Sequence, residues 1–384
     1  MPDRFVIDGA TVVTPDGVLP DCSLRVAEGR IAELRQGAFN GRDPHFDGRG
    51  KHLFPGFIDL HCDAIEKQIE PRPNTFFPVD IAIHELDKKL AACGVTTIYH
   101  SLSFAELEVG LRSNGMAAQI VREVNRQAPA LRINTRVHTR FEVTDDGAVP
   151  ILQELIRDGE VRLFSLMDHT PGQGQFREVA NFKNYYGPVY AKTDEEMDRI
   201  IARKQQAQNG DALTGIESLT DCCREHCVAL ASHDDDCTAK LDWLQQLGVG
   251  MSEFPVNLAA ARAARDRGIA VILGAPNVLR GSSQGGNLSA RDALAAGCGE
   301  ILCSDYAPQT LLHAVLTLDR LGLKPLHEAV NMVSRNPARS VGIGARTGAL
   351  VEGLAADLQL LDLAQGFPRV LKTFVGGREV YASC

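Results

Sequence analysis

The stretch Phe54-Pro55-Gly56-Phe57-Ile58-Asp59-Leu60-His61-Cys62-Asp63 contains a short apolar strand that ends in polar side chains. Seven further apolar segments of strand length follow it, separated by helical patterns, which is the alternation typical of βα units. The predicted strands are Phe57–Leu60, Val95–Tyr99, Leu131–Val137, Val161–Met167, Val228–Ala231, Val249–Ser252, Ala270–Leu273 and Ile301–Ser304. Eight alternations favour a closed (β/α)8 barrel, and a doubly wound open sheet is the alternative.

Helical patterns are predicted over residues 83–92, 105–127, 151–157, 195–208, 241–247, 258–267 and 311–321. The segment Thr170–Thr193, rich in Gly, Gln, Asn and Tyr, is too long for an ordinary connection. We therefore predict that it is a functional loop or lid.

Both ends of the chain have a different pattern. In the first fifty residues apolar and polar side chains alternate between turn residues, which is the period of a strand. The same alternating pattern returns in Asp357–Leu361 and in Thr373–Tyr381. Within the second segment, Gly376-Gly377 suits a tight hairpin turn. We expect residues 1–52 and 346–384 to share one small β domain, with the barrel formed by residues 53–345.

The length of 384 residues suits one barrel of about 250 residues with a modest appendage. A hydrophobic content of 44% and a charged content of 23% exclude disorder and collagen-like repeats. The chain has 40 Lys and Arg against 49 Asp and Glu, a net charge of −9, and no basic tract. This balance argues against nucleic acid and anionic membranes as partners.

No stretch approaches the roughly 18 apolar residues of a membrane span, and residues 1–10 lack an apolar signal core. A cytoplasmic location is therefore expected. The ten cysteines form no C-x2-C pair, so we expect them to be reduced and mostly buried.

Side chains of metal-ligand type stand just beyond the predicted strands, where a barrel of this kind builds its active site. Histidine nitrogens with carboxylate oxygens suit Zn2+, Mn2+ or Fe2+. His61 and Asp63 are two residues apart, so they are expected to project to the same side of the strand and to bind the same ion. The six candidates are His61, Asp63, Glu142, His169, His233 and Asp305.

Each candidate alone has an ordinary explanation. A single His at a strand end is commonly hydrogen-bonded or solvated, and Asp63 or Asp305 could cap the helix that follows. Their recurrence at corresponding positions of separate βα units is much harder to explain by capping. The pattern therefore predicts a metal centre, and the other histidines, including His100 and His138, are assigned structural roles.

The stretch from Phe54 to Asp63, together with Asp305 and the small sheet made from both ends, resembles the amidohydrolase superfamily of metal-dependent hydrolases. The usual first-strand motif there is His-x-His, and this chain has His61-Cys62-Asp63 instead. That departure resembles one branch, the diphosphohydrolases of the carbon-phosphorus lyase pathway for phosphonate breakdown. Gln284 departs from this branch, which tends to carry His there. Further matching stretches lie at residues 70–73, 140–142, 167–175, 231–235, 252–255, 274–281 and 304–306.

The resemblance implies a (β/α)8 barrel with a small β-sandwich domain. It also implies hydrolysis of α-D-ribose 1-methylphosphonate 5-triphosphate to the 5-phosphate and pyrophosphate, through attack by metal-bound hydroxide. By matching position, the six candidates would hold one or two ions, Zn2+ first and Mn2+ or Fe2+ as alternatives. Glu142 would be the bridging carboxylate, and Asp305 would accept the proton of the attacking water.

A polyanionic substrate opposes the net charge of the chain, so local basic residues must offset it. Arg280 follows the seventh strand, and in such barrels phosphate sites often form from the loops after strands seven and eight. Surface solvation explains Lys183 more simply. The substrate-binding candidates are Lys67, Arg72, Arg140, Lys183 and Arg280, with Glu253 and Asn277 from the matching stretches.

Two other functions stay open at this point. An amidase or deaminase of a small cyclic amide would use the same ligands without the basic cluster. A non-catalytic barrel would serve as a scaffold or oligomer subunit, but it has no need of six convergent ligands. The expected partner is a small-molecule ribosyl triphosphate, and the pattern allows a homo-oligomer.

Overall fold

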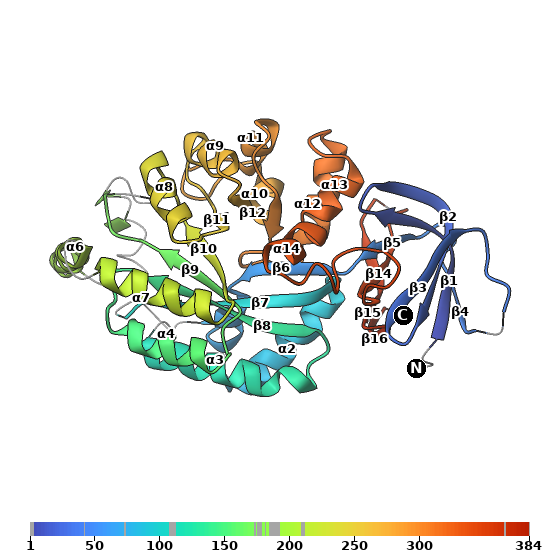
Figure 1. The fold of residues 1–384 in the computed structure, drawn as a ribbon, viewed down its shortest axis with the longest axis horizontal. Helices are drawn as coiled ribbons and strands as arrows, with labels where there is room; N and C mark the ends of the chain where they lie inside the picture. The colour runs from blue at the N-terminus through green and yellow to red at the C-terminus, as the bar shows by residue number, and fades with distance from the viewer. Residues whose placement is uncertain are drawn as a thin grey trace.

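The computed structural model describes residues 4–41, 43–72, 74–106, 113–172, 174, 179–180, 182–183, 193–208, 212–364 and 366–383. It contains two sheets of eight strands each. In Figure 1 helices surround one sheet, and the other sheet lies at the end of the molecule that carries both termini. The predicted loop Thr170–Thr193 falls largely outside the described residues.

The central sheet is a closed (β/α)8 barrel of parallel strands that follow one another in chain order. After the last strand, the N–H of Asp305 donates to the carbonyl of His61, and the N–H of Asp63 donates to the carbonyl of Asp305, both at 2.9 Å. These bonds join the last strand to the first and exclude the open sheet. The strands are β6 (Phe57–Cys62), β7 (Val95–Phe104), β8 (Asn134–Glu142), β9 (Leu163–Met167), β10 (Ala229–His233), β11 (Met251–Glu253), β12 (Ala270–Gly274) and β13 (Ile301–Cys303).

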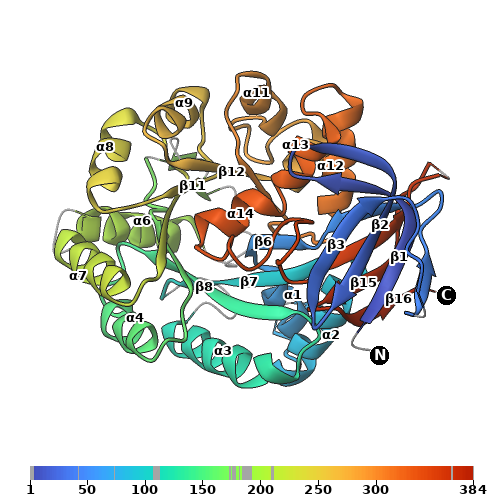
Figure 2. The same cartoon turned by 45° about the vertical axis from the view of Figure 1, so that its right-hand side comes forward.

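Helices lie along the outside of the barrel, and the terminal sheet adjoins it on the side that carries both termini (Figures 1 and 2). The hydroxyl of Ser113 accepts the N–H of Met116, so α3 begins at Asn114 rather than at the predicted residue 105. The helices are α1 (Ala64–Ile69), α2 (Val79–Ala92), α3 (Asn114–Gln127), α4 (Ala148–Arg157), α6 (Asp194–Gln208), α7 (Ala212–Glu225), α8 (Thr238–Gln246), α9 (Leu258–Asp266), α10 (Ala275–Arg280), α11 (Ala290–Ala295), α12 (Thr310–Arg320), α13 (Leu326–Asn331) and α14 (Arg335–Ser340), with a 3-10 turn at Ala128–Ala130.

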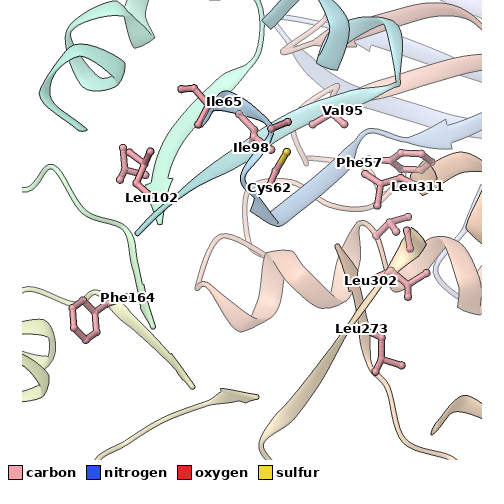
Figure 3. Close-up of a cluster of buried hydrophobic side chains, with 14 of the residues drawn as sticks. Phe57, Cys62, Ile65, Val95, Ile98, Leu102, Phe164, Leu273, Leu302 and Leu311 are labelled. Atoms are coloured by element: carbon pink, nitrogen blue, oxygen red, sulfur yellow. The ribbon is translucent and has the colours of Figure 1, made fainter. Parts of the chain in front are cut away.

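Apolar side chains pack on both faces of the barrel strands. On the outside, Phe57, Val95 and Ile98 belong to the main core together with Ile65 and Leu311 from the helices, as Figure 3 shows. A smaller cluster fills the inside with residues that include Ile58, Leu60, Tyr99, Leu163, Met251, Ile272 and Ile301. Strands buried on both faces read as continuous apolar runs, which is why the sequence revealed all eight.

The second sheet is built from both ends of the chain. Strand β5 pairs with β1 on one side and with β14 on the other, so the last strands are joined to the first ones. The rings of Phe5 and Phe374 stack at 5.0 Å although their strands are not neighbours in the sheet, so the sheet folds over its own core as a sandwich. Its strands are β1 (Arg4–Thr14), β2 (Gly17–Ala27), β3 (Arg30–Gln36), β4 (His45–Asp47), β5 (His52–Pro55), β14 (Leu358–Asp362), β15 (Arg369–Val375) and β16 (Arg378–Ala382).

Three glycines shape two connections of this sandwich. Gly376 and Gly377 join β15 to β16 with φ of 52° and 72°, the positive pair that a type I′ hairpin turn requires, as predicted. Gly56 alone separates β5 from β6, and a Cβ there would lie within 2.7 Å of three side-chain atoms of Thr96. Within the described residues, none of the helices is long and apolar enough to cross a bilayer.

Candidate metal centre

Strand β8 presents three polar side chains on one face. His138, Arg140 and Glu142 alternate with Thr139 and Phe141, and alternate residues of a strand share a face. All three are buried, with 0%, 5% and 2% of their surface exposed. They rise from the interior of the barrel to its mouth, with Glu142 as the last residue of the strand.

The end of β6 brings His61 and Asp63 into the same region. Its pairing with β7 is irregular between Asp59 and Cys62, and such a bulge re-aims the side chains around it. The Oδ2 atom of Asp63 lies 3.9 Å from Nη2 of Arg140. The ring of His61 lies 5.0 to 5.5 Å, between centroids, from the rings of His138, His233 and Phe254.

Three barrel strands end in the same strained backbone conformation. Asp234 after β10, Phe254 after β11 and Asp305 after β13 have φ of 54°, 53° and 57°, a region that residues other than glycine rarely adopt. Adjacent residues of an extended strand would face opposite sides. The turn at Asp234 instead brings its Oδ2 to 3.0 Å from Nδ1 of His233 and 3.5 Å from Nε2 of His169.

His169, His233 and Asp234 form a buried group whose donor atoms all lie within 4.8 Å of one another. Burial raises the pKa of Asp234, but the imidazoles of His233 and His169 lower it on balance, so the carboxylate is charged. Nε2 of His233 is buried and makes no hydrogen bond to any described residue. A charged carboxylate beside such a nitrogen fits a divalent cation, and this nitrogen and oxygen donor set suits Zn2+, Mn2+ or Fe2+.

Asp305 lies near other carboxylate side chains. Burial raises its pKa to about 7, the carboxylates of Asp63 and Asp234 add to the rise, and Arg140 opposes it. The N–H of Asp63 donates to the carbonyl of Asp305 at 2.9 Å, so these two residues lie side by side. The excess of carboxylates would be relieved by a bound cation.

Glu142 lies beside the group formed by His169, His233 and Asp234 but does not belong to it. Its carboxylate accepts the backbone N–H of His169 at 3.3 Å and the hydroxyl of Thr144 at 3.1 Å. Nζ of Lys204, on α6, lies 3.4 Å from its Oε2, and that lysine side chain is 15% exposed. The bridging role of Glu142 therefore stays a prediction.

A second buried group lies deeper and consists of His61, His138 and Glu253. Oε1 of Glu253 accepts a hydrogen bond from Nδ1 of His61 at 2.8 Å, and Oε2 accepts one from the hydroxyl of Ser165 at 2.8 Å. Glu253 is 0% exposed. Both carboxylate oxygens thus have partners inside the barrel, and the expected substrate contact of Glu253 stays a prediction.

The basic candidates differ in their burial and in their partners. Arg140 lies inside the site, and its Nε and Nη2 make no hydrogen bond to any part of the chain that the structure describes. Lys183 forms an ion pair with Asp198 at 2.6 Å. Lys67 and Arg72 are exposed, on α1 and just after it.

The stretch after β12 is helical, which differs from the predicted loop. Arg280 is the last residue of α10 and is exposed. The side-chain amide of Asn277 donates to the carbonyl of Leu288 and accepts the N–H of Ala290, both at 3.0 Å. Asn277 thus holds the segment that follows α10, and its expected contact with the substrate stays a prediction.

Sequence reasoning missed Asp234, His138 and Lys204. The alternation of His138, Arg140 and Glu142 was a usable signal, because it places His138 on the same face as a predicted ligand. The strand period gives no reason to select Asp234 beside His233, because it places adjacent residues on opposite sides, and the left-handed turn breaks that period. No local pattern marks Lys204, which reaches Glu142 from 62 residues further along the chain.

Comparison with known proteins identifies relatives of this chain. The model of the amidohydrolase family matches residues 190–380. The chain is 34% identical over 362 residues to the alpha-D-ribose 1-methylphosphonate 5-triphosphate diphosphatase of Escherichia coli (strain K12), covering 93% of this chain and 94% of that protein. It is 23% identical to a 5-methylthioadenosine/S-adenosylhomocysteine deaminase of Syntrophomonas wolfei, covering 94% of this chain and 86% of that protein.

Solved structures resemble the fold over nearly the whole chain. An N-acetylglucosamine-6-phosphate deacetylase from Pasteurella multocida superposes with a TM-score of 0.67 at 13% identity, covering 99% of this chain and 100% of that one. A Xaa-Pro dipeptidase superposes with a TM-score of 0.68 at 12% identity, with the same coverage. At these identities the likeness concerns the fold alone.

Proposed function

Because the chain belongs to the amidohydrolase family, we propose that it is a metal-dependent hydrolase of a phosphoric anhydride. The proposed substrate is α-D-ribose 1-methylphosphonate 5-triphosphate, and the products are the 5-phosphate and pyrophosphate. The Escherichia coli relative, whose name states this activity, supports the proposal along 93% of the chain.

The observation that carries the proposal is Arg140. Its guanidinium is buried among carboxylates, with two nitrogens that make no hydrogen bond to the described residues. Leaving buried N–H groups unpaired costs about 1–3 kcal/mol each, more for charged groups. A phosphate could accept both, since the planar fork of arginine donates parallel hydrogen bonds to its oxygens. A neutral amide substrate gives no reason to keep such a group there.

His169, His233 and Asp234 would hold the cation, with His61, Asp63, Glu142 and Asp305 around it. A divalent cation bound there would screen the phosphate charge and make hydroxide available near neutral pH. Arg140 and Lys204 would pair with phosphate oxygens that the cation leaves exposed. Asp305, whose pKa is raised to about 7, is suited to accept the proton that the attacking water loses.

The point of bond cleavage follows from leaving-group chemistry. Attack at the phosphorus nearest the sugar expels pyrophosphate, a stable anion that needs little protonation. In 18O-labelled water the label should therefore enter the sugar phosphate. Label in pyrophosphate or orthophosphate would reject this point of attack.

A deaminase of a small cyclic amide or amidine is the second candidate. It is favoured by the full-length similarity to a deaminase and by the same ligand group. Turnover of a panel of ribosyl and nucleoside triphosphates, cyclic amides and cyclic amidines separates the two, with phosphorus NMR for pyrophosphate, loss of ring absorbance for amide hydrolysis and ammonia release for deamination. Pyrophosphate release from a ribosyl triphosphate supports the first, and ammonia release without it supports the second.

A further inference from the structure

Glu253 stands at the end of β11, fully buried, and uses both carboxylate oxygens inside the barrel. One oxygen faces Nδ1 of His61 and the other faces the hydroxyl of Ser165, each at 2.8 Å. These partners come from β6 and β9, so a single side chain connects three of the barrel strands. A buried carboxylate with two short contacts holds a fixed orientation, and it can fix the orientation of its partners as well.

The contact decides which nitrogen of His61 carries the proton. A carboxylate only accepts hydrogen bonds, so Nδ1 must be the donor. A neutral imidazole then has its lone pair on Nε2, and the ring of His233 lies 5.5 Å from that of His61. Metal-binding histidines commonly have such a carboxylate behind them, which sets the tautomer and increases the basicity of the ring.

His138 completes the surroundings of this carboxylate. Its Nδ1 lies 3.0 Å from the carbonyl oxygen of Leu60, which only accepts, so Nδ1 carries the proton. Its Nε2 lies 3.8 Å from Oε2 of Glu253, which is too far for a hydrogen bond. Among the described side chains, the hydrogen bonds to Glu253 come from His61 and Ser165.

We propose that Glu253 is a positioning residue, which holds His61 in the tautomer that offers Nε2 to the metal centre. The inference rests on the metal centre of the proposed function, but not on its substrate. It replaces the expected substrate contact of Glu253 with an action through His61.

The test measures the tautomer of His61 in the metal-free full-length chain. Protein labelled with 15N-histidine is studied by long-range 1H–15N correlation, and a His61→Asn variant identifies the resonances. We expect a protonated Nδ1 and a bare Nε2 in the parent protein, and a mixture of tautomers in Glu253→Ala. Glu253→Gln should restore the parent tautomer, because its amide oxygen can accept from His61 while its NH2 donates to Ser165.

Metal affinity gives the second readout, measured by competition with a chromophoric chelator for Zn2+. Loss of a group behind a metal ligand typically weakens binding 10- to 100-fold, which we expect for Glu253→Ala, with a smaller loss in Glu253→Gln. Asp357→Asn is the matched control. Asp357 is also a buried carboxylate, which accepts hydrogen bonds from Thr347 and Gly376 in the sandwich. Its loss should lower the melting temperature without changing the tautomer of His61 or the affinity.

Three results would overturn the inference. The first is a protonated Nε2 on His61 in the parent protein, and the second is an unchanged tautomer in Glu253→Ala. The third is the loss of one bound ion per chain in both Glu253 variants, which would make Glu253 a ligand in a site with His61 and His138. A parent protein that binds no divalent cation would reject the metal centre itself, while the tautomer measurement would still decide the role of Glu253.

Discussion

Arg140 and Arg280 occupy opposite environments in one barrel. The first is 5% exposed and lies among carboxylates, whereas the second ends a short surface helix. A hydrogen bond to a charged group contributes about 1.5–3 kcal/mol, roughly 10- to 150-fold in rate. We expect Arg140→Ala to lower kcat/KM for the triphosphate about 100-fold, and Arg280→Ala to lower it less. A larger loss in Arg280→Ala would return the phosphate site to the segment after β12.

Asp234 offers a sharper test of the ligand group than the residues that sequence patterns revealed. Asp234→Asn keeps the shape of the side chain but removes the charge that His169 and His233 stabilise. We expect metal content, measured by mass spectrometry of the purified protein, to fall at least tenfold, with an unchanged circular dichroism spectrum. Full metal content in this variant would remove Asp234 from the centre.

At the level of elements, helix α6 places the ammonium group of Lys204 at the mouth of the barrel. Lys204 lies 3.4 Å from Glu142, while Lys183 pairs with Asp198 on the same helix. We expect Lys204→Ala to raise KM for the triphosphate roughly five- to tenfold, because one partner of the phosphates is lost. Lys183→Ala, the matched control, should change KM less. Equal effects of the two substitutions would indicate that they act through the helix and not through the substrate.

The hairpin between β15 and β16 depends on glycine for two reasons. At Gly377 φ is 72°, and a Cβ would lie 2.9 Å from Cγ1 of Val26 and 3.3 Å from Cα of Gly29. We expect Gly377→Ala to lower the free energy of unfolding by about 1–3 kcal/mol, from strain and the close contacts together. Urea titration measures this loss. Activity per folded molecule should stay unchanged, since the hairpin belongs to the sandwich.

The strands were predictable because each is an apolar run buried on both faces, and a local pattern suffices for that. The candidate ligands were predictable as well, because they directly follow these strands in the sequence and are found once the strands are known. The short helix α10 was not, because six residues give too little periodicity to detect. Glu253 was found as a residue of interest, but its partners His61 and Ser165 are 192 and 88 residues away, and no local pattern contains such contacts.

For the whole molecule, Asp362 joins the two ends of the chain. Hydrogen bonds from Lys51, the N–H of Ala364 and Arg369 hold the pKa of its carboxyl well below the usual value of 3.8. A lowered pKa in the folded state stabilises the protein above pH 3.8, and this contribution is lost as the pH falls through the lower value. We expect Asp362→Asn to lower the melting temperature at pH 7, and the difference from the parent protein to shrink between pH 4 and pH 2. A difference that is independent of pH would assign the effect to packing.

The sandwich that unites both ends also sets an order of events during synthesis. Strand β5 ends at Pro55 and its partner β14 begins at Leu358, so about 300 residues must be translated between them. At about 5–20 residues per second, the first strands wait roughly 15–60 seconds on the ribosome before β14 emerges. During that time β5 has an unpaired edge next to the strand that carries His61. The residues translated in that time are those of the barrel, so the barrel can be completed before the sandwich, and the edge of β5 stays unpaired until β14 emerges.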